Sequence, residues 1–210
     1  MKADLDQSAE KPLLVLASQS QQRRMLLQQI GFDPVCLPAD VDESMDRGES
    51  AEQLVRRLAC LKADTCVNSA PLRNLACSHS YVVVLAADTV IELDDQVLGK
   101  PGDEEEAVNM LLQLSGRMHQ VHSGVAVHNV TTGKSRHVQV TTVVQFATLS
   151  ESTARRYWNT GEPAGKAGAY AIQGVGAQFV VHLSGSYSNV VGLPLYESVQ
   201  LLDGAELRAI

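Results

Sequence analysis

The sequence predicts an α/β fold, a mixed, twisted sheet with flanking helices in two lobes around a central cleft. Short apolar runs typical of buried strands alternate along the chain with segments of helical periodicity. One run, Tyr81–Ala87, is apolar without alternation, as expected for a central strand covered on both faces. Because neither an internal repeat nor a low-complexity linker divides the 210 residues, we expect a flexible tail over residues 1–12 and a single domain over residues 13–210.

The domain is expected to begin with a strand and a helix. Pro12–Ala17 is a short apolar run, and Gln22–Ile30 has apolar residues at helical spacing, with Ser18 or Ser20 as its cap and Gly31 at its end. A strand is then expected at Phe32–Leu37 and an acidic loop at Ala39–Ser50. A helix at Ala51–Val67, with Leu54, Leu58 and Leu61 on one side, and a polar connection at Ser69–Ser80 follow.

The second half is expected to complete the sheet. Val90–Leu93 and Gln96–Leu98 form a hairpin around Asp94–Asp95, and Val121–Val130 pairs with His137–Phe146 in a longer one. Capped helices are predicted at Asp103–Leu114 and Ser150–Asn159, and a Gly-rich interruption at Gly161–Gly176. Two short strands are predicted at Gln178–Leu183 and Tyr187–Val191, and a closing helix at Pro194–Leu202.

The charge balance limits the partners. Seventeen Lys and Arg against 24 Asp and Glu give a net charge of −7, which argues against coating a nucleic-acid polymer or an anionic membrane. No apolar stretch reaches the ~18 residues of a membrane span. Four cysteines without a C-x-x-C pair argue against structural zinc and fit a reduced, cytoplasmic protein.

Two segments beside strands suit phosphate and metal chemistry. Ser18–Arg23 precedes a helix, where free N–H groups, two hydroxyls and a guanidinium favour an anion; an ordinary serine cap with a solvated arginine is the alternative. Asp88 directly follows the apolar strand, at the carboxyl end where open α/β sheets place ligands. Its carboxylate can hold a metal or act as a base, and a cap or turn role is the weaker alternative because no helix follows.

Two later segments add cations and an amide. Lys100 stands between Gly99 and Pro101, which would fix an ammonium that faces phosphate. In E-P-A-G-K-A-G-A-Y-A-I-Q-G, glycines bracket Lys166 and Gln173 and permit close approach of a ligand, and the amide can read a base edge. A solvated lysine and a tight reversing loop are the alternatives.

In their order, these blocks resemble the Maf family of nucleoside triphosphate pyrophosphatases from about Leu13 to Leu202. The resemblance is carried by L-A-S-Q-S-Q-Q-R-R, A-A-D-T-V, L-G-K-P, L-S-G-R-M-H-Q-V, the Gly-rich block and G-S-Y-S-N-V-V-G-L-P-L. It implies a fold similar to Maf and inosine-triphosphatase proteins. It also implies metal-dependent hydrolysis between the α and β phosphates, which yields a nucleoside monophosphate and pyrophosphate.

The resemblance also implies residue roles. Asp88 matches the proton acceptor that activates water, and Glu43 and Asp88 match carboxylates near a magnesium, manganese or cobalt ion. The residues that match phosphate-binding positions are Ser18, Ser20, Arg23, Lys62, Lys100 and Lys166. Thr89 and Gln173 match the dTTP/UTP branch, and Gln22 occupies a position that bears on substrate choice and usually holds arginine.

The main hypothesis is therefore a cytoplasmic dTTP/UTP pyrophosphatase with a preference for pyrimidines. Its partner is the nucleoside triphosphate, neither a nucleic-acid polymer nor a membrane, and the resemblance is compatible with a homodimer. The rival hypotheses are hydrolysis of 7-methyl-GTP or of modified pyrimidine nucleotides, and a non-catalytic nucleotide sensor that regulates septum formation.

Overall fold

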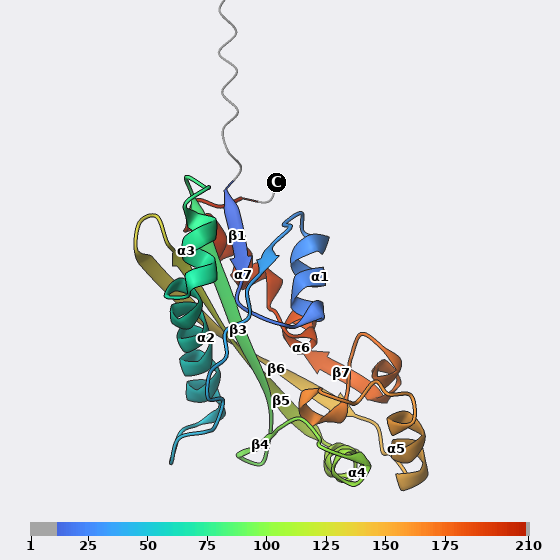
Figure 1. The fold of residues 1–210 in the computed structure, drawn as a ribbon. Coiled ribbons are helices and arrows are strands. Elements are labelled where there is room, and N and C mark those ends of the chain that lie inside the picture. Colours follow the sequence, from blue (N-terminus) through green and yellow to red (C-terminus); the bar gives the residue numbers. More distant parts are fainter. Residues whose placement is uncertain (1–11, 209–210) are drawn as a thin grey trace, which may run out of the picture.

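The computed structural model describes residues 12–208 and is built around a seven-stranded mixed sheet (Figure 1). The strands are β1 (Leu13–Leu16), β2 (Val35–Cys36), β3 (Val82–Leu93), β4 (Gln96–Leu98), β5 (Met118–Asn129), β6 (Lys134–Phe146) and β7 (Val180–Ser184). Their order is β2-β1-β3-β5-β6-β7, with β4 paired to β3. The pairs that β1 makes with β2 and β3 are parallel and the other pairs are antiparallel, which confirms the predicted class.

One long strand, β3, replaces two shorter expected ones. The apolar run was expected to end at Ala87, yet Asp88 and Thr89 continue the strand because both remain paired with β5, opposite Gly124 and Ser123. The hairpin then turns as expected at Asp94 and Asp95, which adopt φ values of 52° and 62°. Asp tolerates this left-handed region better than most residues.

Side-chain alternation places different helices on the two faces of the sheet. Leu14 and Leu16, with Val83, Leu85 and Ala87 of β3, pack with α1 (Gln21–Gln29) and α7 (Leu195–Asp203). Leu13, Val15 and the even-numbered residues of β3 contact α2 (Ala51–Val67) and α3 (Ala70–Ala76). Because strand side chains alternate between faces, one strand supplies both cores.

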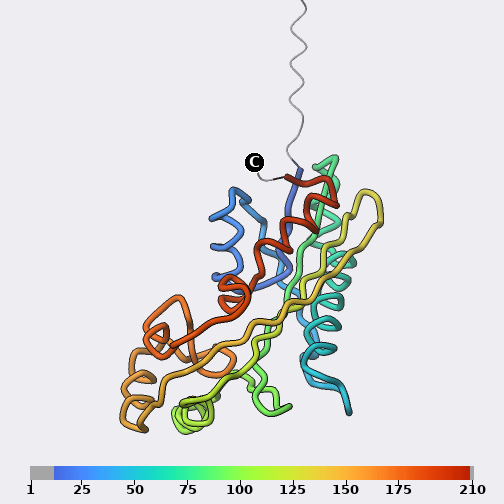
Figure 2. The backbone as a smooth tube through the Cα atoms, turned by 180° about the vertical axis from the view of Figure 1, so that it is seen from behind, coloured from blue at the N-terminus to red at the C-terminus, as the bar shows by residue number. Residues whose placement is uncertain are grey.

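A second apolar core lies at the far end of the sheet. There α4 (Glu104–Leu114), α5 (Glu151–Trp158) and the 3₁₀ turns Ala167–Ala169 and Val175–Phe179 pack around Phe146 and the end of β3. Figures 1 and 2 show α4 and α5 on the same side of the sheet as α1 and α7, with α2 on the opposite side. The two lobes therefore share one sheet.

Two helices occupy segments expected to have another structure. Ser69 caps α3 by accepting a hydrogen bond from the Leu72 N–H, and Pro71 is accommodated in the first turn, where no intrahelical N–H bond is lost. The last expected strand is the helix α6 (Tyr187–Val191). Asn189 on α6 is buried and donates to the Val121 carbonyl and the Thr142 hydroxyl. These tertiary bonds outweigh the β propensity of the valines.

Helix α2 has the predicted bounds but a different inward face. Ser50 and Gln53 form a reciprocal capping box at its start. Leu61 was expected to face inward with Leu54 and Leu58, but it is 38% exposed, while the adjacent Lys62 is 7% exposed. The strand expected at Phe32–Leu37 is reduced to β2.

Of the expected tail, all but Pro12 lies outside the described residues. None of the helices within residues 12–208 combines the length and apolar character that a bilayer crossing requires.

Candidate active site

The site is centred on a notch in the edge of β3. β1 pairs with β3 only as far as Leu85, and β4 begins to pair with it at Ile91. From Ala86 to Val90, this edge of β3 has no partner strand among the described residues, and Asp88 lies in the middle of the notch. Asp88 was expected at the carboxyl end of its own strand. It lies within that strand, just past the carboxyl end of the neighbouring β1. The strand whose carboxyl end marks the ligand site, as expected in an open α/β sheet, is therefore β1.

A cleft of about 830 Å³ opens from this notch between the two lobes. It is lined by every residue expected at the site: Ser18, Ser20, Gln22, Arg23, Glu43, Lys62, Asp88, Thr89, Lys100, Lys166 and Gln173. They come from the turn between β1 and α1, from α1, from the loop before α2 and α2 itself, from β3, from the loop after β4, and from the Gly-rich loop, which are far apart in sequence. A cleft of this volume suits a small-molecule ligand.

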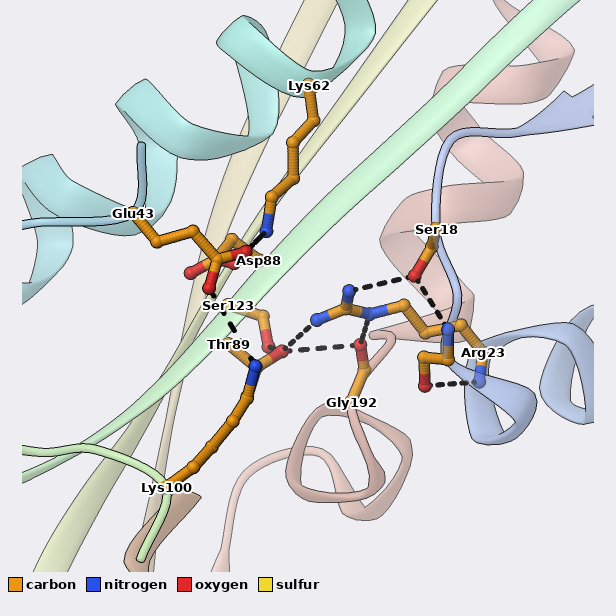
Figure 3. Close-up of polar contacts among 10 residues, drawn as sticks. Ser18, Arg23, Glu43, Lys62, Asp88, Thr89, Lys100, Ser123 and Gly192 are labelled. Carbon is orange, nitrogen blue, oxygen red and sulfur yellow. Dashed lines mark hydrogen bonds and ion pairs between the residues drawn. The ribbon is translucent and has the colours of Figure 1, made fainter. Parts of the chain in front are cut away.

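Lys62 joins two carboxylates at the floor of the cleft. Its Nζ atom is 2.7 Å from Asp88 Oδ1 and 2.5 Å from Glu43 Oε1 (Figure 3). Lys62 and Asp88 are buried, and Glu43 reaches them from the acidic loop before α2. Since a buried ammonium is stable only when it is paired, the two carboxylates explain how Lys62 occupies an inward position.

The second oxygen of each carboxylate faces the cleft region. Glu43 Oε2 lies 3.8 Å from Lys100 Nζ, and Asp88 Oδ2 has no hydrogen-bond partner among the described residues. Burial raises the pKa of Glu43, but Lys62, Lys100 and Arg23 outweigh it, and the pKa lies below its ordinary value. Glu43 is therefore ionised at neutral pH and available to a cation.

Arg23 is fixed on the opposite wall by contacts to three elements. Its Nε donates to the Gly192 carbonyl (2.9 Å), its Nη2 to Thr89 Oγ1 (3.2 Å) and its Nη1 to Ser18 Oγ (3.3 Å) (Figure 3). Burial lowers the pKa of the guanidinium, and the charges of Asp88 and Glu43 oppose that shift. The guanidinium is thus held in place before any ligand binds.

The start of α1 forms the rest of this wall. Ser20, one of the two caps proposed from the sequence, accepts from the Arg23 N–H, and Ser18 Oγ accepts from the Ser20 N–H. Gln22 lines the cleft beside them. With free N–H groups and a hydroxyl pair at a helix start, this wall suits an anion.

Lys166 and Gln173 approach from the second lobe on the Gly-rich loop. Gly168 donates a backbone hydrogen bond of 3.0 Å to the Gly99 carbonyl, which ties this loop to the residue before Lys100. The two lysines and Gln173 therefore line the cleft opposite α1. An anion bound here would lie between Arg23 on one side and Lys100 and Lys166 on the other.

Three further residues of the site were not proposed from the sequence. Ser123 is fully buried on β5 and shares a 2.7 Å hydrogen bond with the Thr89 hydroxyl. Gly192, at the end of α6, supplies the carbonyl that orients Arg23. Gly124 lies opposite Asp88 in the sheet. Ser123 and Gly124 become recognisable only once the register of β3 and β5 is known.

The donor set fits a divalent metal that is completed by the ligand. Within residues 12–208, no group of three or more His, Cys, Asp or Glu side chains surrounds one point. Glu43 and Asp88, however, already converge on a single cation, the Lys62 ammonium. Two carboxylates, with phosphate oxygens and water, are the usual ligands of magnesium at phosphate-binding sites.

Comparison with known proteins gives one consistent assignment. A family model described as "Maf-like protein" matches residues 13–205. Proteins named dTTP/UTP pyrophosphatase are 48% identical in Saccharophagus degradans, over 96% of this chain and 91% of the relative, and 46% identical in Pseudoalteromonas atlantica, over 93% and 98%. That of Vibrio cholerae is 47% identical over 90% and 96%. Among solved structures, the Staphylococcus aureus Ham1 protein aligns with a TM-score of 0.40 and 19% identity, over 64% of this chain and 71% of that one.

Proposed function

The chain belongs to the Maf family, and from this premise we propose that it hydrolyses dTTP and UTP to the nucleoside monophosphate and pyrophosphate. The observation that carries the proposal is the position of Asp88. Its carboxylate is buried at the floor of a nucleotide-sized cleft, is oriented by Lys62 through Oδ1, and keeps Oδ2 unpaired among the described residues.

Asp88 is the proposed general base. Its Oδ2 accepts a proton from the water that attacks the α-phosphorus, and pyrophosphate leaves. The transition state of phosphoryl transfer is stabilised mainly by charged groups held in position around the phosphate oxygens, and little by covalent bonds to the protein. Arg23, Lys100 and Lys166 stabilise the negative charge on the phosphate oxygens, and the hydroxyls of Ser18 and Ser20 hold the phosphates at the start of α1.

A divalent ion, magnesium, manganese or cobalt, is proposed as the cofactor. Glu43 and Asp88 would hold it, because both carboxylates already point to one cation. When bound, the ion neutralises phosphate oxygens and helps to orient the triphosphate. In the absence of the metal ion, the Lys62 ammonium keeps the two carboxylates together.

Three residues are proposed to set the preference for pyrimidines. Gln173 presents an amide that can pair with both a donor and an acceptor on a uracil or thymine edge. Thr89 contributes by holding Arg23, since its hydroxyl accepts from Nη2 of the guanidinium. Gln22 provides a neutral amide where an arginine would add a charged, bidentate donor.

We propose that residues 13–210 act as one cytoplasmic domain, either alone or as a homodimer. All four cysteines are free, as is usual in a reducing compartment. The cleft lining carries four lysine and arginine side chains and four carboxylates, so the net charge of −7 lies outside it. A small triphosphate that meets the four cations is a better partner than a nucleic-acid polymer or an anionic membrane, which would have to cross the acidic remainder.

A nucleotide panel tests the substrate. Phosphate release with Mn²⁺ and added inorganic pyrophosphatase is measured for dTTP, UTP, CTP and 7-methyl-GTP, with dTTP and UTP expected to be hydrolysed fastest. Much faster turnover of 7-methyl-GTP would contradict the assignment.

Asp88→Asn tests the proposed base. We expect kcat to fall by at least about 10²-fold, because the amide cannot accept the proton, while nucleotide binding is retained. Asp95→Asn, at the turn after the same strand, is the matched control and should keep full activity. Undiminished turnover by Asp88→Asn would remove Asp88 from this role. Binding without turnover by the wild-type protein would instead support a nucleotide sensor.

A further inference from the structure

The Gly-rich loop that presents Gln173 is fastened to a half-buried carboxylate, that of Glu162, outside the polar cluster of the cleft. Glu162 Oε1 accepts hydrogen bonds from the Tyr157 hydroxyl (2.6 Å) and the Gly176 N–H (2.9 Å), and Oε2 accepts from the Val175 N–H (2.9 Å). Tyr157, on α5, is 2% exposed. Its hydroxyl also accepts a 3.0 Å hydrogen bond from the Ala171 N–H.

These four hydrogen bonds hold the chain on both sides of Gln173. Ala171 is fixed two residues before it through Tyr157, while Val175 and Gly176 are fixed after it by Glu162. The Gln173 side chain is exposed in the cleft and makes no hydrogen bond of its own within residues 12–208. Its position therefore depends on the backbone, and the backbone depends on Glu162 and Tyr157.

Two glycines of the loop are required by this arrangement. A Cβ on Gly174 would lie 2.1 Å from Glu162 Oε2, and one on Gly176 would lie 2.6 Å from the Tyr157 hydroxyl. At these two positions, glycine lets the loop close around the carboxylate and the phenol. The sequence had favoured a different reason, close approach of a ligand.

We propose that Glu162 and Tyr157 are positioning residues that set base selectivity by fixing Gln173 in the cleft. The inference rests on the proposed function, since it concerns the same cleft. A uracil or thymine base presents an N3–H donor beside an O4 acceptor, and one well-placed amide pairs with both. Cytosine presents the reverse pattern, with an N3 acceptor beside an N4 amine. In the orientation that matches uracil, an amide whose backbone is held at this place in the cleft favours uracil, and an amide whose backbone is displaced favours neither base.

The ionised form of Glu162 is needed because a carboxylate can accept all three of its hydrogen bonds. Burial raises the pKa of this carboxyl, but its three hydrogen-bond donors and the charge of Lys166 outweigh that effect and hold the pKa below its ordinary value. A glutamine would turn an NH₂ group toward an N–H or O–H donor and lose part of the set. A phenylalanine at position 157 keeps the ring in the core and removes the hydroxyl alone.

The experiment compares UTP with CTP in four proteins: wild type, Glu162→Gln, Tyr157→Phe and the double variant. We expect the ratio of kcat/KM for UTP over CTP to fall by about tenfold, the value of one hydrogen bond. The loss should come mainly from a higher KM for UTP, with kcat little changed because Asp88 is not touched. The double variant should lose no more than the larger single loss, because both residues hold one loop.

Glu151→Gln, an exposed carboxylate on α5 paired with Arg155, is the control and should keep the ratio. An equal loss for UTP and CTP, or an unchanged ratio, would overturn the inference. If Glu162→Gln does not fold, Tyr157→Phe decides alone. Dissociation constants for UTP and CTP, measured in the Asp88→Asn background, give the same ratio without turnover. A wild-type protein that binds both but hydrolyses neither would refute the proposed function and leave this comparison decisive.

Discussion

At the scale of single residues, the least expected is Lys62, a cation on the buried face of α2. Its ammonium lies between Glu43 and Asp88, at 2.5 and 2.7 Å, and thereby replaces the solvation that it loses. Removing either carboxylate would leave a buried charge without one of its partners. The same ion pairs link the acidic loop, α2 and β3, so this residue shapes the floor of the cleft and offsets part of the negative charge of its two carboxylates.

Arg23→Ala should weaken catalysis through the phosphate wall. The change removes a guanidinium that contacts Gly192, Thr89 and Ser18. We expect kcat/KM for dTTP to fall by about 1.5–3 kcal/mol of transition-state binding, the range for hydrogen bonds to a charged group. Arg24→Ala, the exposed neighbour on α1, should have little effect. Equal kinetics for the two variants would show that Arg23 is not part of the site.

His119 should make stability depend on pH. The ring is buried against Phe146 and Tyr170, and burial lowers its pKa to about 4. The unfolded chain binds a proton near pH 6.5 whereas the folded chain does not, so stability is full above pH 6.5 and declines as pH falls toward 4. From pH 7.5 to 5.5, urea denaturation should show a loss of about 1.4 kcal/mol.

His119→Phe should remove most of that slope, whatever its effect on stability at pH 7.5. His137→Gln, at an exposed position on β6, should retain the slope. Equal slopes in all three proteins would mean that another group titrates in this interval.

At the scale of elements, α2 lies unusually close to the sheet at one point. A Cβ on Gly124 of β5 would be 2.2 Å from the Val55 carbonyl oxygen and 2.9 Å from the Arg56 nitrogen, both of which are helix backbone. Gly124 is also the residue that pairs with Asp88 across the strands. The absent side chain therefore lets the helix approach closely enough for Lys62, two turns further along, to reach Asp88.

Gly124→Ala should separate these elements. The added methyl group meets backbone, which cannot rotate away, so we expect a loss of about 1–3 kcal/mol in stability from overpacking and a marked fall in kcat as the Lys62–Asp88 contact lengthens. Val127→Ala on the same strand, which packs on the opposite face, should lower stability but keep kcat. A Gly124→Ala protein with normal kcat would show that the spacing of α2 is not needed for activity.

Local signals predicted the elements unevenly. Helix α2 was predicted from an apolar stripe and the β5–β6 hairpin from two strand-like runs around a short turn, and the residues of each signal lie close together in sequence. Helix α6 could not be predicted in that way, because Asn189 is held by Val121 and Thr142 from distant strands. The inward turn of Lys62 likewise depends on carboxylates that arrive from elsewhere in the chain.

At the scale of the whole molecule, the cleft collects cations from a chain with a net charge of −7. Arg23 and Gly192 lie 169 positions apart, and Lys62 and Asp88 lie 26 apart. No periodicity encodes such contacts. The phosphate turn, Asp88, Lys100, Lys166 and Gln173 could be proposed one by one from flanking glycines, caps and strand ends. Gln22, Glu43, Lys62 and Thr89 were expected only from the resemblance. The placement of all these residues in one cleft could be expected only from the resemblance of the ordered blocks to a known family.

The unbroken course of β3 has a consequence for how substrate enters. Val82–Leu93 runs from the first lobe to the second, and it is paired with β5 from Val83 to Glu92. A hinge between the lobes would have to break that ladder next to Asp88, so the lobes should not open against each other. Access should depend on residues 39–50, the loop before α2, which carries Glu43 and has no strand or helix of its own.

Amide hydrogen exchange measures this directly. Amides of β3 around Asp88 should exchange only in global unfolding, whereas those of residues 39–50 should exchange far faster and slow down when nucleotide is bound. Fast exchange along β3 would instead indicate a hinge. If the loop of residues 39–50 moves above a rigid β3, mutations in that loop can change the rate of nucleotide capture while Asp88 keeps its position.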